Sequence, residues 1–262
     1  MRIAELETFV IANPPPSHGG AYFVVAKLTT DDGIVGYGEA YGSTFHPDVV
    51  THAIDDLAEQ CLIGEDPRHV ERFWRRAYSR GFTQRPDVTV MGATSALEIA
   101  CWDIVGKATG VPVHELLGGR VHETLRSYTY LYGREGDTGD VYVDAAVAAA
   151  RAVEEVERGF TAVKFDPAGP YTVMGGHQPT QEWLGRSEAF VREIRAAVGD
   201  RADLLFGTHG QFTPGGAARL ARVLEPFDPL WFEEPVPPDD VAGMAAVAAG
   251  TSVPIATGER LT

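Results

Sequence analysis

LWFEEP, residues 230–235, lies between two similar stretches, LLFGTHGQF at 204–212 and PIATGER at 254–260. Each stretch is a short apolar run that stops abruptly at polar residues. That pattern is typical of a buried parallel strand where it emerges at its carboxyl end. The three stretches therefore predict three parallel strands whose ends carry polar side chains.

Gly207, Glu233 and Glu259 follow these runs at equal intervals, since 233 − 207 and 259 − 233 are both 26. A strand, a loop, a helix and a return loop need about that many residues, so the period predicts consecutive βα units of a barrel. Active sites of such barrels lie at the carboxyl ends of the strands, where Glu233 and Glu259 would converge on one divalent cation. Hard oxygen ligands favour Mg²⁺ over zinc. A Glu-Glu pair before proline is by itself more often a solvated loop, but the recurrence at Glu259 favours the metal site.

Composition excludes several classes of protein. The chain has 262 residues, of which 44% are hydrophobic and 23% charged, so it is globular and long enough to bury a large core. The net charge of −15 argues against nucleic acid and against a membrane surface as partners. No apolar run reaches the ~18 residues of a membrane span, and the N-terminus has no apolar signal region. Cys61 and Cys101 lack metal-type spacing, and we expect buried, reduced thiols in a cytoplasmic protein.

The first part of the chain predicts a small antiparallel sheet followed by helices. Residues 1–12 alternate as in a strand, and residues 22–39 form a hairpin that turns at Asp31-Asp32-Gly33. Residues 48–110 are helical, most clearly at 93–110, where apolar residues recur at helical spacing. The boundary of this part is expected near residue 120.

Two loops of this part, PPPSHGG at 14–20 and YGSTFHP at 41–47, are rich in proline, glycine and aromatic residues. They carry His18, Tyr41 and His46, together with Phe45. We take His18, Tyr41 and His46 as candidate substrate-binding residues. Ordinary surface loops are an equally good interpretation.

The second part alternates strand and helix. Five strands are expected, near residues 127, 162, 204, 230 and 254, with helices at about 141–158, 181–198, 214–225 and 238–249. A closed barrel needs eight strands. Three further βα units are thus expected outside this chain, or its two sheet edges are paired by another molecule. We therefore expect the isolated chain to be poorly stable or to form a homo-oligomer through these edges.

Four pieces of the sequence together resemble one family. They are SALEIACWDIVGKATGVPVHELLGG (95–119), GFTAVKFD (159–166), WFEEP (231–235) and PIATGER (254–260). In this order they resemble the enolase superfamily, in its mandelate racemase/muconate lactonizing branch, which includes galactonate- and mannonate-type acid-sugar dehydratases. The resemblance implies an α/β fold, a modified TIM barrel of which about five of eight βα units are present, with an N-terminal α+β capping domain. The capping domain would span residues 1–120 and the barrel domain residues 121–262.

The resemblance also implies a Mg²⁺ site, which departs from the pattern of the family at one ligand. Glu233 and Glu259 match two metal ligands of the family. The third ligand of the family is an Asp at the end of the third strand, where this chain has Gly207. Asp166, which stands in place of a second family lysine, is the candidate replacement.

Catalytic roles follow from the same resemblance. Lys164 matches a lysine that faces the substrate, and His209 matches a histidine that protonates the departing hydroxyl in dehydratases. His209 is alternatively a packed residue or a metal ligand. Arg260 completes the candidate substrate-binding residues. The family's other base, a His-Asp pair, belongs to later strands than those in this chain.

Three functions therefore remain open. The first is a Mg²⁺-dependent lyase that takes the α-proton of a sugar acid, a small-molecule carboxylate, and eliminates water through an enolate. The second is a racemase or cycloisomerase that uses the same enolate without loss of water. The third is a truncated, non-catalytic member of the family.

Overall fold

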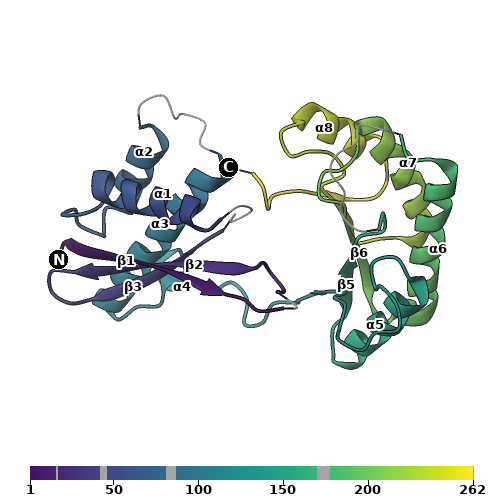
Figure 1. Ribbon diagram of the computed structural model, residues 1–262, viewed down its shortest axis with the longest axis horizontal. Helices are drawn as coiled ribbons and strands as arrows, with labels where there is room; N and C mark the ends of the chain where they lie inside the picture. Colours follow the sequence, from purple (N-terminus) through teal and green to yellow (C-terminus); the bar gives the residue numbers. More distant parts are fainter. Residues whose placement is uncertain (16, 42–45, 81–86, 170–177, 262) are drawn as a thin grey trace. The chain divides into compact units, whose positions relative to one another are not determined.

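The computed structural model describes residues 1–262 except 16, 42–45, 81–86, 170–177 and 262. The described chain forms two compact units, Met1–Thr124 and Leu125–Leu261, which are taken in turn (Figure 1). The boundary expected near residue 120 falls close to the division between them. The capping role of the first unit stays a prediction.

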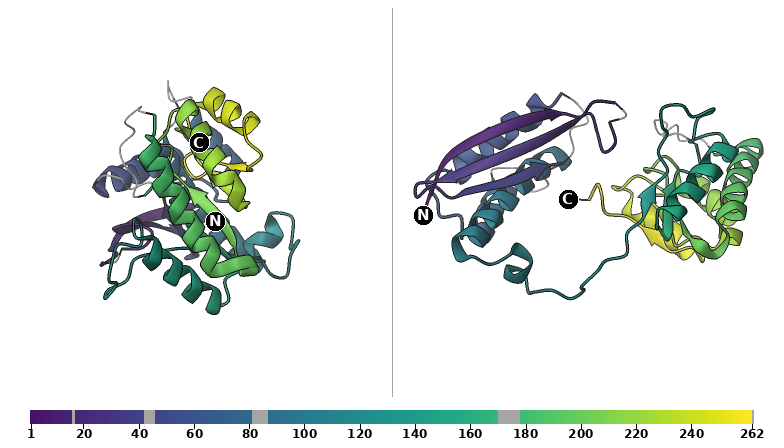
Figure 2. Two further views of the ribbon diagram at one scale, coloured as in Figure 1. Left: turned by 90° about the vertical axis from the view of Figure 1, so that its right-hand side faces the viewer. Right: turned by 90° about the horizontal axis from the view of Figure 1, so that it is seen from below.

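The first unit has an antiparallel sheet of three strands in the order β1-β2-β3, with the hairpin that the sequence predicts. Its strands are β1 (Ile3–Ala12), β2 (Tyr22–Thr30) and β3 (Val35–Ala40). Its helices are α1 (Asp48–Cys61), α2 (Val70–Tyr78), α3 (Val88–Thr109) and α4 (Val113–Leu116). Helices α1 and α3 lie on one face of the sheet, as the two further views show (Figure 2).

Helix α3 is the core element of this unit. Its N-terminus is capped by Asp87, whose side chain accepts hydrogen bonds from two backbone N–H groups of the first turn. Its C-terminus is capped by Gly110, which adopts the left-handed conformation. It packs directly on the backbone of β3, because a Cβ at Gly38 would lie 1.9 Å from the carbonyl oxygen of Ala96. Glycine at this position of the strand is therefore required by the close approach of the helix.

Among the described residues, α3 is also the one helix long and apolar enough, by length and composition, to cross a membrane. Its buried side chains, Leu97 and Ile104 among them, pack in the core of the first unit. A buried core helix of a soluble protein passes the same test, so this property carries little weight.

The second unit is built on five parallel strands in the order β4-β5-β6-β7-β8. The five predicted strands and their parallel sense are confirmed. The strands are β4 (Thr129–Tyr130), β5 (Ala162–Phe165), β6 (Asp203–Gly207), β7 (Trp231–Glu233) and β8 (Ile255–Ala256). The first, expected near residue 127, is only two residues long. Closure of such a sheet into a barrel stays a prediction.

A helix follows each of the first four strands of the second unit, as the sequence predicts. These helices are α5 (Ala145–Glu157), α6 (Gln181–Val198), α7 (Pro214–Leu224) and α8 (Val241–Ala249), with 3-10 turns η1 (Gly199–Arg201) and η2 (Glu225–Phe227). Residues 170–177, between β5 and α6, lie outside the described residues.

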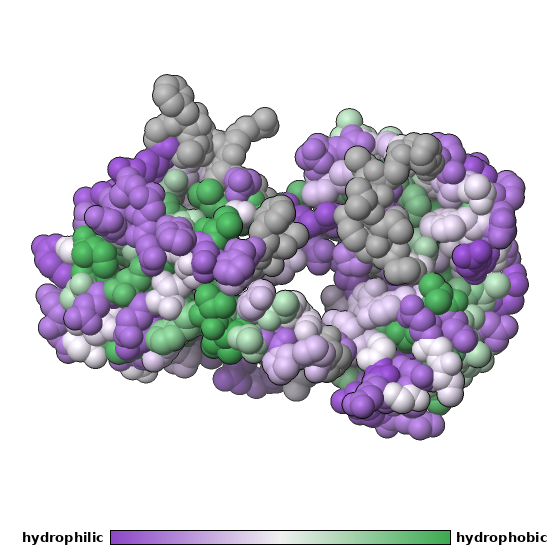
Figure 3. Space-filling view, viewed as in Figure 1, coloured by the Kyte–Doolittle hydropathy of each residue, from purple (hydrophilic) through white to green (hydrophobic). Residues whose placement is uncertain are grey.

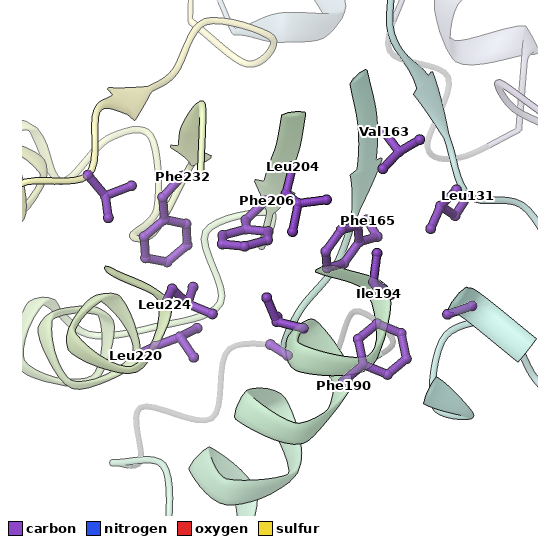
Figure 4. Close-up of a cluster of buried hydrophobic side chains, with 14 of the residues drawn as sticks. Leu131, Val163, Phe165, Phe190, Ile194, Leu204, Phe206, Leu220, Leu224 and Phe232 are labelled. Atoms are coloured by element: carbon purple, nitrogen blue, oxygen red, sulfur yellow. The ribbon is translucent and has the colours of Figure 1, made fainter. Parts of the chain in front are cut away.

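The two faces of the parallel sheet carry different side chains. Val163, Phe165, Leu204, Phe206 and Phe232 point from one face into the core that the helices build (Figure 4). Successive residues of a strand alternate between faces. The opposite face of the sheet therefore carries the residues between them, namely Lys164, Leu205, Gly207 and Glu233.

The strand register corrects one expectation. Gly207 pairs with Glu233 across β6 and β7, which agrees with the 26-residue interval, but Glu233 pairs with Ala256 across β7 and β8. The matching position thus comes 23 residues on (256 − 233), and Glu259 lies three residues beyond it. The expectation that Glu259 occupies the equivalent point was wrong. The cause is a shorter connection: α8 has 9 residues, whereas α7 has 11 and is extended by the 3 residues of η2.

The surface of each unit is mostly hydrophilic in the view of Figure 3, as the charge composition leads one to expect. Exposed apolar side chains also occur, for example Phe9, Val10 and Ile11 on β1.

Candidate active site

A hollow of about 610 Å³ in the second unit is the candidate site. It is lined by Lys164 of β5, by His209 after β6 and by Glu259 after β8, together with Tyr128, Thr129, Tyr130 and Tyr132 in and around β4. The structure thus brings together three of the residues that the sequence singled out. A hollow at the carboxyl ends of parallel strands is where ligands bind in such folds.

The tyrosines of β4 were not among the candidate residues. Their signal was present in the sequence, because Tyr128, Tyr130 and Tyr132 alternate and so share one face of a strand. Tyr130 pairs in register with Lys164 and therefore lies on the same face. Burial and the charge of Asp166 raise the pKa of Tyr130, so its phenol stays protonated and available as a hydrogen-bond donor.

Lys164 is bound to Glu233. Its Nζ lies 2.6 Å from Oε1 of Glu233, and the indole N–H of Trp231 donates to Oε2 of the same carboxylate over 3.1 Å. The ammonium also lies 5.8 Å from the centre of the Tyr128 ring, within range of a cation–π interaction. Lys164 and Glu233 are both mostly buried, so solvent screens this ion pair little.

Asp166 and His209 form a second pair. Nδ1 of His209 lies 3.7 Å from Oδ2 of Asp166, while Oδ1 of Asp166 accepts the backbone N–H of Ala168 over 2.8 Å. The Asp166 carboxylate raises the pKa of His209, and burial raises the pKa of Asp166. The arrangement favours a protonated imidazole beside a carboxylate, which is what a general acid requires.

The backbone around this site is strained at two points. His209 (φ 51°) and Glu234 (φ 44°) adopt the left-handed conformation although neither is glycine. Such residues cost about 1–3 kcal/mol each and persist only where the surroundings hold them. Here the N–H of Gly210 donates to the carbonyl of Glu234 over 2.7 Å, and the hydroxyl of Thr208 donates to the same carbonyl over 3.0 Å. The turn at His209 and the turn at Glu234 therefore stabilise each other, and together they fix the direction of the His209 side chain.

Arg260, a predicted substrate-binding residue, is bound inside the protein. Its Nε donates to Oε2 of Glu234 over 2.9 Å, and Nη2 donates to the same oxygen. Glu234 is almost completely buried and was not a candidate residue in the sequence. The pair anchors the segment after β8, next to Glu259. Binding of substrate by Arg260 stays a prediction.

The carboxylates do not fit a Mg²⁺ centre as they lie. Among the described residues, no three of His, Cys, Asp and Glu are grouped closely enough to hold one metal ion. Glu233 is engaged by Lys164 and Asp166 lies beside His209, whereas Glu259 is exposed on the wall of the hollow. The predicted ligands Glu233, Glu259 and Asp166 are therefore present but not assembled, and their role in metal binding stays a prediction.

The other substrate-binding candidates belong to the first unit. His18 and Tyr41 are exposed, and His46 lies 3.3 Å from Asp48 through its Nδ1. Phe45 of the same loop lies outside the described residues. The part of His18, Tyr41 and His46 in binding a substrate stays a prediction.

Comparison with known proteins defines the class. Residues 7–118 match the mandelate racemase/muconate lactonizing enzyme N-terminal domain, and residues 147–262 match the enolase C-terminal domain-like family. A solved structure from Labrenzia alexandrii DFL-11, assigned to the mandelate racemase/muconate lactonizing enzymes, is 61% identical with a TM-score of 0.93. The match covers 100% of this chain and 69% of that one. The chain therefore belongs to the mandelate racemase/muconate lactonizing enzyme branch of the enolase superfamily.

Curated relatives are sugar-acid dehydratases. The D-gluconate dehydratase of Thermoproteus tenax is 33% identical over 260 residues, which are 99% of this chain and 50% of that protein. The D-galactonate dehydratase of Ralstonia nicotianae is 33% identical over 262 residues, which are 100% of this chain and 62% of that protein. The chain thus spans between half and two thirds of the length of these relatives.

Proposed function

We propose that this chain belongs to an acid-sugar dehydratase, a lyase that removes the α-proton of a sugar acid and then eliminates the β-hydroxyl as water. The observation that carries the proposal is the hollow that Lys164 and His209 both line, together with the tyrosines in and around β4. The names of the curated relatives support the same class of reaction.

His209 is proposed as the general acid. In the elimination, a base takes the α-proton and leaves an enolate; the family resemblance assigns this base to Lys164 in its neutral form or to the His-Asp pair of later strands. The C–O bond to the β-hydroxyl then breaks as that oxygen takes a proton. The imidazole, which Asp166 favours in its protonated form, supplies this proton. Water leaves, and the enol that remains rearranges to an α-keto acid.

Lys164 is proposed to face the carboxylate of the substrate. As an ammonium it stabilises the negative charge that grows on the substrate when the α-proton leaves. To act as the base instead, Lys164 first has to release Glu233 and lose a proton. The phenol of Tyr130 is placed to donate a hydrogen bond on the same face of the sheet.

Mg²⁺ stays the predicted cofactor, with Glu233, Glu259 and Asp166 as the predicted ligands. By the family resemblance, members of this branch stabilise the enolate with this ion. A cation would also favour the binding of an anionic substrate to a chain whose net charge is −15. A cytoplasmic location, which fits the metabolic class of the relatives, is a further proposal. So is a homo-oligomeric state, which the two edges of the five-stranded sheet favour.

A panel of sugar acids tests the proposal. We expect the purified protein, supplied with Mg²⁺, to convert at least one of D-gluconate, D-galactonate, D-xylonate and D-mannonate to an α-keto acid, detected by its reaction with semicarbazide. Deuterium uptake from heavy water at the α-carbon without loss of water would assign the protein to the racemases or cycloisomerases. Absence of both reactions across the panel would argue against the dehydratase.

A further inference from the structure

The carbonyl of Glu234 holds the chain on both sides of His209. It accepts the hydroxyl of Thr208 over 3.0 Å and the N–H of Gly210 over 2.7 Å. Gly210 has a φ of 69°, and a Cβ on it would lie 2.9 Å from the backbone Cα of Pro237. The turn that carries His209 therefore fits closely against the segment after β7, and its direction is coupled to the conformation of Glu234.

Glu234 is itself held at two further points, both after or within β8. Its N–H donates to the carbonyl of Ala256 over 2.9 Å, and Oε2 of its carboxylate accepts Nε of Arg260 over 2.9 Å and also Nη2. The side chain of Glu234 is only 1% exposed, and its Oε1 has no hydrogen-bond partner among the described residues. Because a buried carboxylate needs a neutralising partner, the charge of Arg260 keeps this side chain inside the protein.

Loss of that partner would reach His209 through the backbone. An uncompensated carboxylate moves towards water, and the left-handed conformation of Glu234 (φ 44°) persists only while its surroundings hold it. Once Glu234 relaxes, its carbonyl no longer holds the turn at Thr208 and Gly210. The imidazole of His209 then loses its fixed position beside Asp166.

We propose that Arg260 is a positioning residue that acts through the buried Glu234 to fix the imidazole of His209. This role is an alternative to the substrate binding predicted for Arg260. Its kinetic consequence rests on the proposed function, in which His209 is the general acid. The position of the imidazole itself can be measured without any substrate.

Labelling of histidines with diethyl pyrocarbonate, followed by mass spectrometry, makes this measurement. We expect His209 to react at least about fivefold faster in Arg260→Met than in the parent, because the imidazole turns out into solvent. That factor corresponds to about 1 kcal/mol of backbone strain released. Unchanged labelling of His209 in a folded Arg260→Met protein overturns the proposal.

Arg195→Met is the matched control for a general loss of stability. Arg195 donates to the carbonyls of Ala202 and Phe227, just before β6 and β7, so it joins the same two units at the opposite ends of their strands. His209 should react in this variant at the parent rate. The exposed His122 should react equally in all the proteins and serves as the internal reference. Faster labelling of His209 in Arg195→Met to the same extent would show a merely structural effect and overturn the proposal.

A conservative replacement tests the part played by charge. Arg260→Lys keeps a cation beside Glu234, so it should label His209 more slowly than Arg260→Met does. If Arg260→Met does not fold, Arg260→Gln, which keeps a hydrogen-bond donor but no charge, takes its place in the comparison. Equal labelling in the lysine variant and the uncharged variant overturns the proposal.

Kinetics with a responsive sugar acid separate positioning from substrate binding. Arg260→Met should lower the rate of water loss by about tenfold or more, while KM and α-proton exchange stay close to the parent values. A raised KM with an equal fall of both rates would make Arg260 a substrate-binding residue and overturn the proposal. If no sugar acid reacts with the parent, the proposed function fails, and the labelling still decides this inference.

Discussion

The ammonium of Lys164 lies 2.6 Å from Oε1 of Glu233, although the two residues stand on strands separated by β6. This ion pair joins a predicted catalytic residue to a predicted metal ligand. It places both functions on one face of the parallel sheet, opposite the face that packs against the helices. In the structure, Glu233 is therefore neutralised by Lys164.

Replacement of the predicted ligands tests metal binding. We expect Glu233→Gln and Glu259→Gln each to lower the affinity for Mg²⁺ by about tenfold or more, because each removes a charged oxygen donor. Titration calorimetry measures this, with Glu157→Gln, an exposed residue of α5, as the control. Unchanged Mg²⁺ affinity in Glu233→Gln would exclude Glu233 as a ligand.

Phe206→Ala tests the core beneath the site. The side chain of Phe206 is fully buried and packs against Phe165, with 5.2 Å between the ring centres. Its truncation leaves a cavity, and we expect a loss of about 3–5 kcal/mol in the free energy of unfolding. Urea unfolding gives the value. Leu230→Ala, at a position 40% exposed, should cost much less, and equal losses in the two variants would be evidence against this core.

Arg151→Met tests the support of the β4 tyrosines. The buried guanidinium of Arg151 donates to the carbonyl oxygen of Tyr132 over 2.6 Å and to Asp137 over 2.7 Å. Its loss leaves these acceptors without their partner, which for a buried ion pair costs about 3–5 kcal/mol of stability. The control is Arg158→Met at the C-terminal end of the same helix, where the arginine is exposed and Glu155 keeps Arg134 as a second partner, so we expect a cost of about 0–1 kcal/mol. Similar melting temperatures for the two variants would contradict the buried network.

Cys101 should be inert in the folded protein. Burial raises the pKa of its thiol to about 12, with a further contribution from the charge of Glu98. The thiolate is the reactive form, so iodoacetamide at pH 8 should label Cys101 only after unfolding. Since the folded pKa lies above the ordinary 9.0, the protonated thiol adds stability below pH 9, and this is lost as the pH rises from 9 towards 12. Rapid labelling of the native protein at Cys101 would contradict this environment.

Most of the fold could be predicted from the sequence, because its signals are local. The hairpin at β2 and β3 follows from alternation around a turn at Gly33, and the parallel strands follow from apolar runs that end at polar residues. The register of β8 could not be predicted from equal spacing. It depends on how many residues α8 and its loops use, and the spacing of the motifs along the chain does not reveal that number.

Several residues of the candidate site could be predicted from the sequence, but the contacts between their side chains could not. Lys164, His209 and Glu259 do line one hollow. Spacing along the chain cannot show that Lys164 crosses Gly207 to reach Glu233, or that Arg260 turns inward to the buried Glu234, because both contacts depend on side-chain direction across strands. The alternation of the tyrosines around β4 predicts a strand, but it does not show that their side chains line a site.

The most direct test of the account is the effect of His209→Asn on two rates measured with the most responsive sugar acid of the panel. One is the loss of water, and the other is the uptake of deuterium from heavy water at the α-carbon. We expect water loss to fall by about 10²–10⁴-fold, the usual contribution of a general acid, while α-proton exchange falls much less. His122→Asn, at an exposed histidine, should change neither rate. A His209→Asn protein that dehydrates at the parent rate would contradict the account, as would a joint loss of both activities and of Mg²⁺ binding, which would make His209 a metal ligand.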